Sequence, residues 1–240
     1  MSAISQTPVT LRLARWPESV QVALLIAGPC ISSVLLVGGY RSLLGLPPGT
    51  SSVMHLAWLI YSTTCWVAVG ATYLWSRRRG MVGQVFAFRL PSGLDWIVAL
   101  GGTALGLFVI YPFSQWLAHL LFGTGIRGMG FDAHQPWTLT AVVFWAVVSA
   151  PFCEEILFRG LAVAHLRAWH WPAWAIGVAI TLGFAAIHLP YFGMGGVSLI
   201  LIWGGMLAAV RLWRDHLTPG WMIHAANNVV AFVVIPLLLR

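Results

Sequence analysis

Two adjacent glutamates, Glu154 and Glu155, stand in the otherwise apolar stretch PFCEEILFRG, and Arg159 follows them. The chain has six acidic residues in all, and two of them are here. A carboxylate at membrane depth is costly, by about 2.5–3.5 kcal/mol at a helix centre on insertion scales. The pair therefore indicates a specific partner or a chemical role.

Glu155 and Arg159 are four residues apart, with the acid on the N-terminal side, which is the favourable order on a helix. Their pairing would neutralise one of the two carboxylates. Glu154 points about 100° away around the same helix. We therefore expect Glu154 to be the free carboxylate, available as a base.

Polar residues recur at helical depth in two later segments. His188 ends the run FAAIH, four residues after Phe184, and His224 begins the run HAANN, four residues before Asn228. The second spacing places His224 and Asn228 on one face of a helix. Three separate helices thus offer ionisable or amide groups to a bundle interior, and intramembrane ionisable residues are functional candidates.

These residue types suit the hydrolysis of an amide bond without a covalent intermediate. A carboxylate near a histidine can deprotonate a water that attacks a carbonyl carbon, and a second histidine with an asparagine can donate hydrogen bonds to the oxyanion. Ser149 lacks the G-x-S-x-G context of a nucleophilic serine. Cys153 adjoins the glutamates, and as a nucleophile it would need a base that lowers its pKa; we keep it as a minor alternative.

The elements that must position these residues are membrane helices. Of 240 residues, 59% are hydrophobic and 8% charged, whereas soluble domains carry about 25% charged residues. The composition predicts an all-α polytopic membrane protein of about seven to eight transmembrane helices, with the active site in the C-terminal bundle. Helices are expected at roughly 20–40, 53–75, 94–122, 138–168, 172–190, 196–213 and 218–238. The third and fourth of these segments are long enough to contain an eighth span.

The basic residues predict orientation rather than a nucleic-acid partner. The net charge is +7, and all 13 basic residues are arginines. With the N-terminus inside, ten arginines fall on inner segments and three on outer ones, as the positive-inside rule requires. The inner set is Arg12, Arg15, Arg77, Arg78, Arg79, Arg89, Arg159, Arg167, Arg211 and Arg214; the outer set is Arg41, Arg127 and Arg240. The three cysteines form no CxxC pair, so neither a disulfide framework nor a zinc–thiolate site is expected.

The three motifs together resemble those of the CAAX-protease and bacteriocin-processing (CPBP/Abi) family of intramembrane glutamic endopeptidases. The family patterns E-E-x-x-x-R, F-x-x-x-H and H-x-x-x-N occur here in order, over roughly residues 138–232. The resemblance implies that Glu154 activates water with help from His188. It also implies that His224 and Asn228 form the oxyanion site. The supporting residues would be Glu155, Arg159 and Phe184; Asn227 is a neighbour outside the motif position.

The resemblance also bears on organisation and cofactors. Residues 1–137 would be N-terminal transmembrane helices without a recognised motif, and residues 138–240 a CPBP-type catalytic helix bundle, together forming one integral membrane unit. Two histidines and a glutamate could hold zinc, but the chain has no H-E-x-x-H pair. The resemblance implies a metal-independent protease without a cofactor.

The expected activity is cleavage of a peptide or protein substrate at the lipid bilayer, by a protein of the bacterial inner membrane with its N-terminus in the cytoplasm. The alternative is a non-catalytic membrane binding or immunity protein of the same fold. A proton-coupled transporter would predict repeated halves with broken helices, and we find no internal repeat. The oligomeric state stays open.

One geometric difficulty accompanies this hypothesis. The expected span boundaries put His188 toward the outer end of its helix and His224 toward the inner end of the last one. The two must meet if they serve one site. Shifted boundaries, helix tilt or a break at Pro190 would bring them together.

Overall fold

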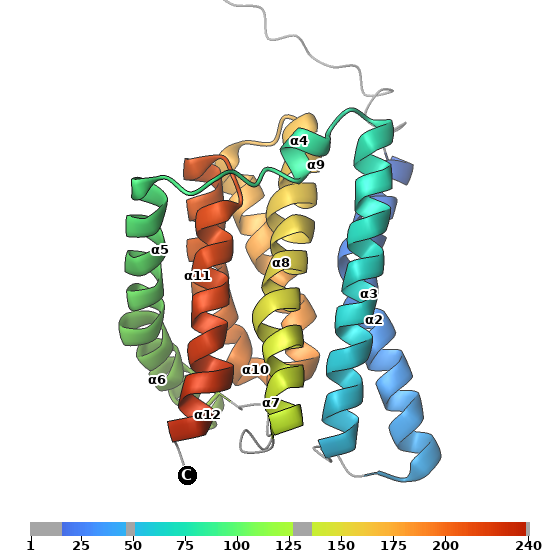
Figure 1. Ribbon diagram of the computed structural model, residues 1–240, viewed down its shortest axis with the longest axis vertical. Helices are drawn as coiled ribbons and strands as arrows, with labels where there is room; N and C mark the ends of the chain where they lie inside the picture. Colours follow the sequence, from blue (N-terminus) through green and yellow to red (C-terminus); the bar gives the residue numbers. More distant parts are fainter. Residues whose placement is uncertain (1–15, 47–50, 127–135, 239–240) are drawn as a thin grey trace, which may run out of the picture.

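The computed structural model describes residues 16–46, 51–126 and 136–238, which form helices and no β-strand. The first helices, α2 (Trp16–Leu44) and α3 (Ser51–Arg78), pack side by side as a hairpin (Figure 1). Next come a short helix and a long helical run with a π-helical turn. These are α4 (Val82–Val85), α5 (Gly93–Leu105), η1 (Gly106–Ile110) and α6 (Tyr111–Phe122).

The second half of the chain is also helical. One helical run extends from residue 136 to residue 168, and the chain ends in another from 218 to 238. The first consists of α7 (Pro136–Val142), η2 (Val143–Ser149), α8 (Ala150–Glu154), η3 (Glu155–Ala162) and α9 (Val163–Ala168). The remainder is α10 (Ala173–Arg214), α11 (Thr218–Val229), η4 (Val230–Val234) and α12 (Ile235–Leu238).

The helix α10 is folded back on itself. Gly193 has φ +65° and ψ −174°, a conformation that interrupts the helix and that glycine adopts without penalty. The two arms lie together, because a Cβ on Gly204 would meet Phe184 at 3.1 Å and one on Gly177 would meet Leu212 at 3.4 Å. The expected helices at 172–190 and 196–213 are these two arms. The break lies at Gly193, so Pro190 remains inside the first arm.

The all-α polytopic membrane fold is confirmed. Among the described residues, five helical runs are long and apolar enough to cross a membrane, with α10 counted as one run of 42 residues. The runs at 93–122 and 136–168 each form one continuous run of helix, so neither contains the eighth span that their lengths allowed.

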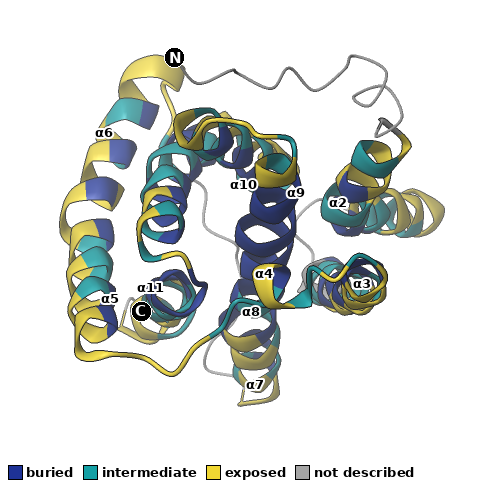
Figure 2. Ribbon diagram, turned by 90° about the horizontal axis from the view of Figure 1, so that it is seen from above, coloured by how far each residue is buried: buried dark blue, intermediate teal, exposed yellow. Residues whose placement is uncertain are grey.

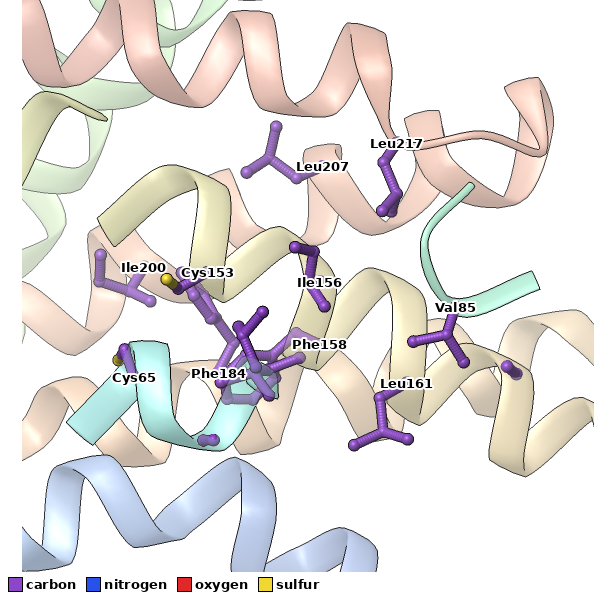
Figure 3. Packing of buried hydrophobic residues seen from close by; sticks show 14 of the residues in the cluster. Cys65, Val85, Cys153, Ile156, Phe158, Leu161, Phe184, Ile200, Leu207 and Leu217 are labelled. Atoms are coloured by element: carbon purple, nitrogen blue, oxygen red, sulfur yellow. The ribbon is translucent and has the colours of Figure 1, made fainter. Parts of the chain in front are cut away.

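The run from α8 to α9 is the centre of the bundle. Figure 2 shows it buried around most of its circumference, whereas the surrounding helices expose their outer faces. Every residue of η3 is buried. The main apolar cluster joins this run to α3, α10 and α11, and Figure 3 shows Phe158 and Phe184 in its middle with Cys65 of α3 beside them.

One end of the bundle collects arginines. Arg79 at the end of α3 pairs with Glu18 of α2, Arg167 of α9 with Asp215, and Arg214 of α10 with Asp95 of α5. The chain segments at this end are tied together by Leu217 N–H, which donates to the Ala87 carbonyl at 2.9 Å. Most of the described arginines of the expected inner set lie here, but Arg159 does not: it is fully buried in the bundle. Residues Arg12, Arg15, Arg127 and Arg240 lie outside the described residues.

Candidate active site

The two glutamates lie where a regular helix passes into a wider turn. Glu154 ends α8 and Glu155 begins the π-helical segment η3. Their residues are 4% and 0% exposed, and Arg159 is 0% exposed. Such π-helical turns often occur at functional sites. Three charged side chains are therefore held at the centre of an apolar bundle.

Glu155 pairs with Arg159, as the spacing predicts. Arg159 Nη1 lies 3.4 Å from Glu155 Oε1. The guanidinium also donates from Nη2 to the Gly204 carbonyl at 3.3 Å and lies over the Phe184 ring, 4.1 Å from its centre. Gly220 leaves room for the pair, since a Cβ there would lie 3.2 Å from Glu155 Oε2.

Glu154 faces both histidines. His188 Nε2 lies 4.0 Å and His224 Nε2 3.7 Å from the same carboxylate oxygen, Oε2. The other oxygen, Oε1, accepts a hydrogen bond from the Tyr61 hydroxyl at 2.8 Å. The two imidazoles thus converge on one oxygen at separations longer than a direct hydrogen bond. This convergence resolves the difficulty over the depths of His188 and His224.

The hydrogen-bond partner of Nδ1 defines the tautomer of each histidine. His188 Nδ1 lies 2.7 Å from the Phe184 carbonyl, which can only accept, so Nδ1 carries a proton. In the neutral ring, Nε2 is then an acceptor facing Glu154. His224 Nδ1 lies 3.1 Å from Glu155 Oε1, so this nitrogen donates when Glu155 is ionised. Each histidine is oriented by an acceptor on a neighbouring turn or helix.

Phe184 connects the motifs through ring contacts. Its ring centre lies 4.5 Å from that of His188 and 6.1 Å from that of His224, and Arg159 covers it. Trp203 of the second α10 arm also contacts His224 edge-on, with ring centres 4.6 Å apart. Packing thus limits the orientations open to both imidazoles.

The side chains of the two asparagines contact different helices. The Asn228 side-chain nitrogen donates to the Ala146 carbonyl at 2.8 Å, which uses one of its two N–H groups. Asn227 donates instead to the Ile223 carbonyl, and its side chain faces Gly106 of η1. Only Asn228 therefore faces the helix that carries the glutamates.

The two alternative nucleophiles are poorly placed. Cys153 is fully buried. The Ser149 hydroxyl accepts a hydrogen bond from the Trp66 indole at 2.7 Å and is also buried. Neither has the exposed position that an attacking group requires.

Sequence reasoning missed Tyr61. It lies on α3 in the apolar run LIYSTT, which carries no motif spacing. A single tyrosine in such a run resembles any other membrane-facing tyrosine, so only the packing of α3 against α8 reveals its contact with Glu154.

Over the residues described here, no group of three or more His, Cys, Asp or Glu side chains is arranged to hold a metal ion. The site has instead two carboxylates, one guanidinium and two imidazoles in mutual contact.

Comparison with known proteins supports the motif resemblance. Residues 136–230 match the model of a family described as type II CAAX prenyl endopeptidase Rce1-like. This segment contains all three motifs and leaves α2 to α6 outside the match. No curated protein and no solved structure matches the chain.

Proposed function

We propose that the chain is a membrane endopeptidase that cleaves a membrane-associated peptide through a water activated by Glu154, a proposal supported by the match of residues 136–230 to the Rce1-like family of type II CAAX prenyl endopeptidases. The observation that carries this proposal is the convergence of two imidazole nitrogens on Glu154 Oε2, at 4.0 and 3.7 Å. A polar contact of this length is one that a water molecule can bridge.

In the proposed reaction the water donates one proton to Glu154 Oε2 and a hydrogen bond to the acceptor Nε2 of His188. Its oxygen forms a bond to the scissile carbonyl carbon, and the carbonyl becomes an oxyanion. When the C–N bond breaks, the proton held by Glu154 passes to the leaving amine. The products are a carboxylic acid and an amine, and the reaction is balanced without a metal or cofactor.

The oxyanion donors would be His224 Nε2 and the second N–H of Asn228. His224 already uses Nδ1 toward Glu155, so it can donate from Nε2 only as the imidazolium. We therefore assign Glu155 a part in orienting His224, in addition to its pairing with Arg159.

The arginine distribution supports an orientation. Several described arginines of the inner set lie at the end of the bundle that holds α4 and the end of α9 (Figure 1). By the positive-inside rule this end, where α2 begins, faces the cytoplasm. We propose the inner membrane of a bacterium as the location.

The test is mass-spectrometric mapping of protein termini in host membranes. Strains carrying the wild-type chain, Glu154→Gln, or the matched control Glu18→Gln are compared at equal expression; Glu18 pairs with Arg79 outside the site. Termini that disappear with Glu154→Gln and persist with Glu18→Gln would support the proposal and identify the substrate. Identical termini in all three strains would refute proteolysis and favour the binding or immunity role.

A purified assay complements this test. Protein in lipid nanodiscs is incubated with a prenylated CAAX peptide and with its unprenylated counterpart, each with and without a chelator. Cleavage that a chelator leaves unchanged fits the water mechanism; cleavage lost on chelation and restored by added metal would overturn it. Comparing the two peptides tests whether the lipid is recognised.

A further inference from the structure

One contact of Glu154 comes from outside the family-matched segment. Tyr61 belongs to α3, whereas the match begins at residue 136. Its hydroxyl donates to Glu154 Oε1 at 2.8 Å. The residue Glu154 is 4% exposed, so a single hydrogen bond has a large effect on how its carboxylate is held.

The contact gives the two carboxylate oxygens of Glu154 different partners. Oε1 accepts from Tyr61, while Oε2 faces His188 and His224. A carboxylate without such a bond can rotate and exchange its oxygens. With it, Oε2 remains directed toward the imidazoles.

Tyr61 is itself held in place by a neighbour from the helix that carries His188. Its ring meets that of Tyr191 edge-on, with centres 5.8 Å apart. Tyr191 lies three residues after His188, so both belong to the same stretch of α10. The helix α3 thereby reaches the site through the hydroxyl and the ring of Tyr61.

We propose that Tyr61 is a positioning residue for the hydrolysis: its hydroxyl fixes the rotamer of Glu154 and keeps Oε2 free to take the proton of the attacking water. This inference rests on the proposed function. It assigns a part in the proposed site to α3, which lies outside the family-matched residues 136–230.

Tyr61→Phe tests this most directly, because it removes the hydroxyl and keeps the ring contact with Tyr191. The matched control is Tyr191→Phe, the same change on a neighbouring ring whose hydroxyl is not bonded to Glu154. Cleavage of the substrate or peptide identified above is measured as kcat and KM. We expect Tyr61→Phe to lower kcat by about 10–100-fold, the loss of a hydrogen bond to a charged group. KM should stay within about twofold of wild type, and Tyr191→Phe should stay near wild type in both constants.

A second measurement is independent of turnover. Thermal unfolding is recorded for Tyr61→Phe, for Glu154→Ala and for the double variant. Tyr61→Phe should lower Tm in the wild-type background and leave it nearly unchanged when Glu154 is alanine, because the bond's partner is then absent.

The results separate the two proposals. The positioning role is overturned if Tyr61→Phe keeps kcat within about twofold of wild type, if it changes only KM, or if the unfolding effects simply add. If Glu154→Gln cleaves the substrate at the wild-type rate, the proposed mechanism is overturned, and the role of Tyr61 with it. Loss of kcat with Tyr61→Phe, together with full activity of Tyr191→Phe and coupled unfolding, would establish the role.

Discussion

The buried ion pair between Glu155 and Arg159 provides the sharpest test of how this bundle tolerates charge. Arg159 makes three contacts: the carboxylate at 3.4 Å, the Gly204 carbonyl at 3.3 Å and the Phe184 ring at 4.1 Å. Arg159→Gln removes the guanidinium and leaves Glu155 ionised in an apolar setting. Breaking a buried pair in this way costs about 3–5 kcal/mol.

We expect the lower part of that range, about 3–4 kcal/mol, because His224 remains 3.1 Å from Glu155 as a second partner. For a chain of this size, 1 kcal/mol corresponds to about 2–4 °C in Tm. The variant should therefore unfold about 6–16 °C below wild type. Thermal unfolding in nanodiscs, followed by the fluorescence of the 14 tryptophans, measures this shift.

Two further variants make the experiment decisive. Arg167→Gln breaks the pair with Asp215, whose side chains are 41% and 60% exposed. Such surface pairs contribute about 0–1 kcal/mol, so its Tm should fall by at most about 4 °C. The double variant Glu155→Gln/Arg159→Gln removes both charges and should recover part of the loss of Arg159→Gln. If Arg159→Gln is no less stable than Arg167→Gln, or if the double variant recovers nothing, the argument from an uncompensated buried charge is wrong.

Three other predictions concern packing, chemistry and pH. Gly160→Ala should lower Tm by about 2–12 °C, the effect of overpacking by about 1–3 kcal/mol, because its Cβ would collide with the backbone carbonyl oxygen of Val85; an unchanged Tm would mean that α4 moves freely. Glu155→Gln should lower Tm by about 6–20 °C, because it leaves Arg159 as an unpaired buried charge; measured well below that Tm, its kcat should be at least about tenfold lower than wild type, since a carboxylate that fixes the orientation of an imidazole strengthens it as a catalyst, and an unchanged kcat would show that the orientation of His224 does not depend on Glu155. Burial lowers the pKa of His216 from its ordinary 6.5, so the unfolded state takes up the proton first; its contribution to stability is complete above about pH 6.5 and is lost as pH falls below that value. Tm measured from pH 8 to pH 5 should fall more steeply in wild type than in His216→Gln, and parallel curves would contradict this.

The helices and the motif residues could be predicted from the sequence for distinct physical reasons. A helix that crosses the hydrocarbon core of a bilayer needs about 20 consecutive apolar residues. The apolar runs are therefore long and continuous, and the expected spans agree with the helices to within a few residues. Glu154 and His188 were found because ionisable residues are rare at that depth. The meeting of His188 and His224 at Glu154 Oε2 depends on how α8, α10 and α11 pack, which spacing within one helix does not encode.

Two features escaped sequence reasoning, and Arg159 was counted in two conflicting roles. Tyr61 lacks a motif, and its contact arises only from the packing of α3 against α8. A break at Pro190 was one of three ways considered to bring His188 and His224 together, but the reversal needs positive φ and falls on Gly193, in the gap between the two expected helices, while proline keeps a helical φ. Counting Arg159 among the flanking charges was wrong, because an arginine four residues after a buried glutamate serves as its counter-ion inside the bundle.

The π-helical turn at Glu155–Ala162 has an evolutionary and engineering consequence. A π-turn corresponds to one residue inserted into a regular α-helix, and its register is shifted by about 100° relative to the helix without that residue. Deleting a single residue between 156 and 158 would therefore restore an ordinary helix and rotate Glu154 relative to Arg159 and everything after it. The carboxylate would leave the two imidazoles, although every motif side chain would still be present. In this chain the alignment of the proposed catalytic residues depends on the number of residues in one helical turn as much as on their identity.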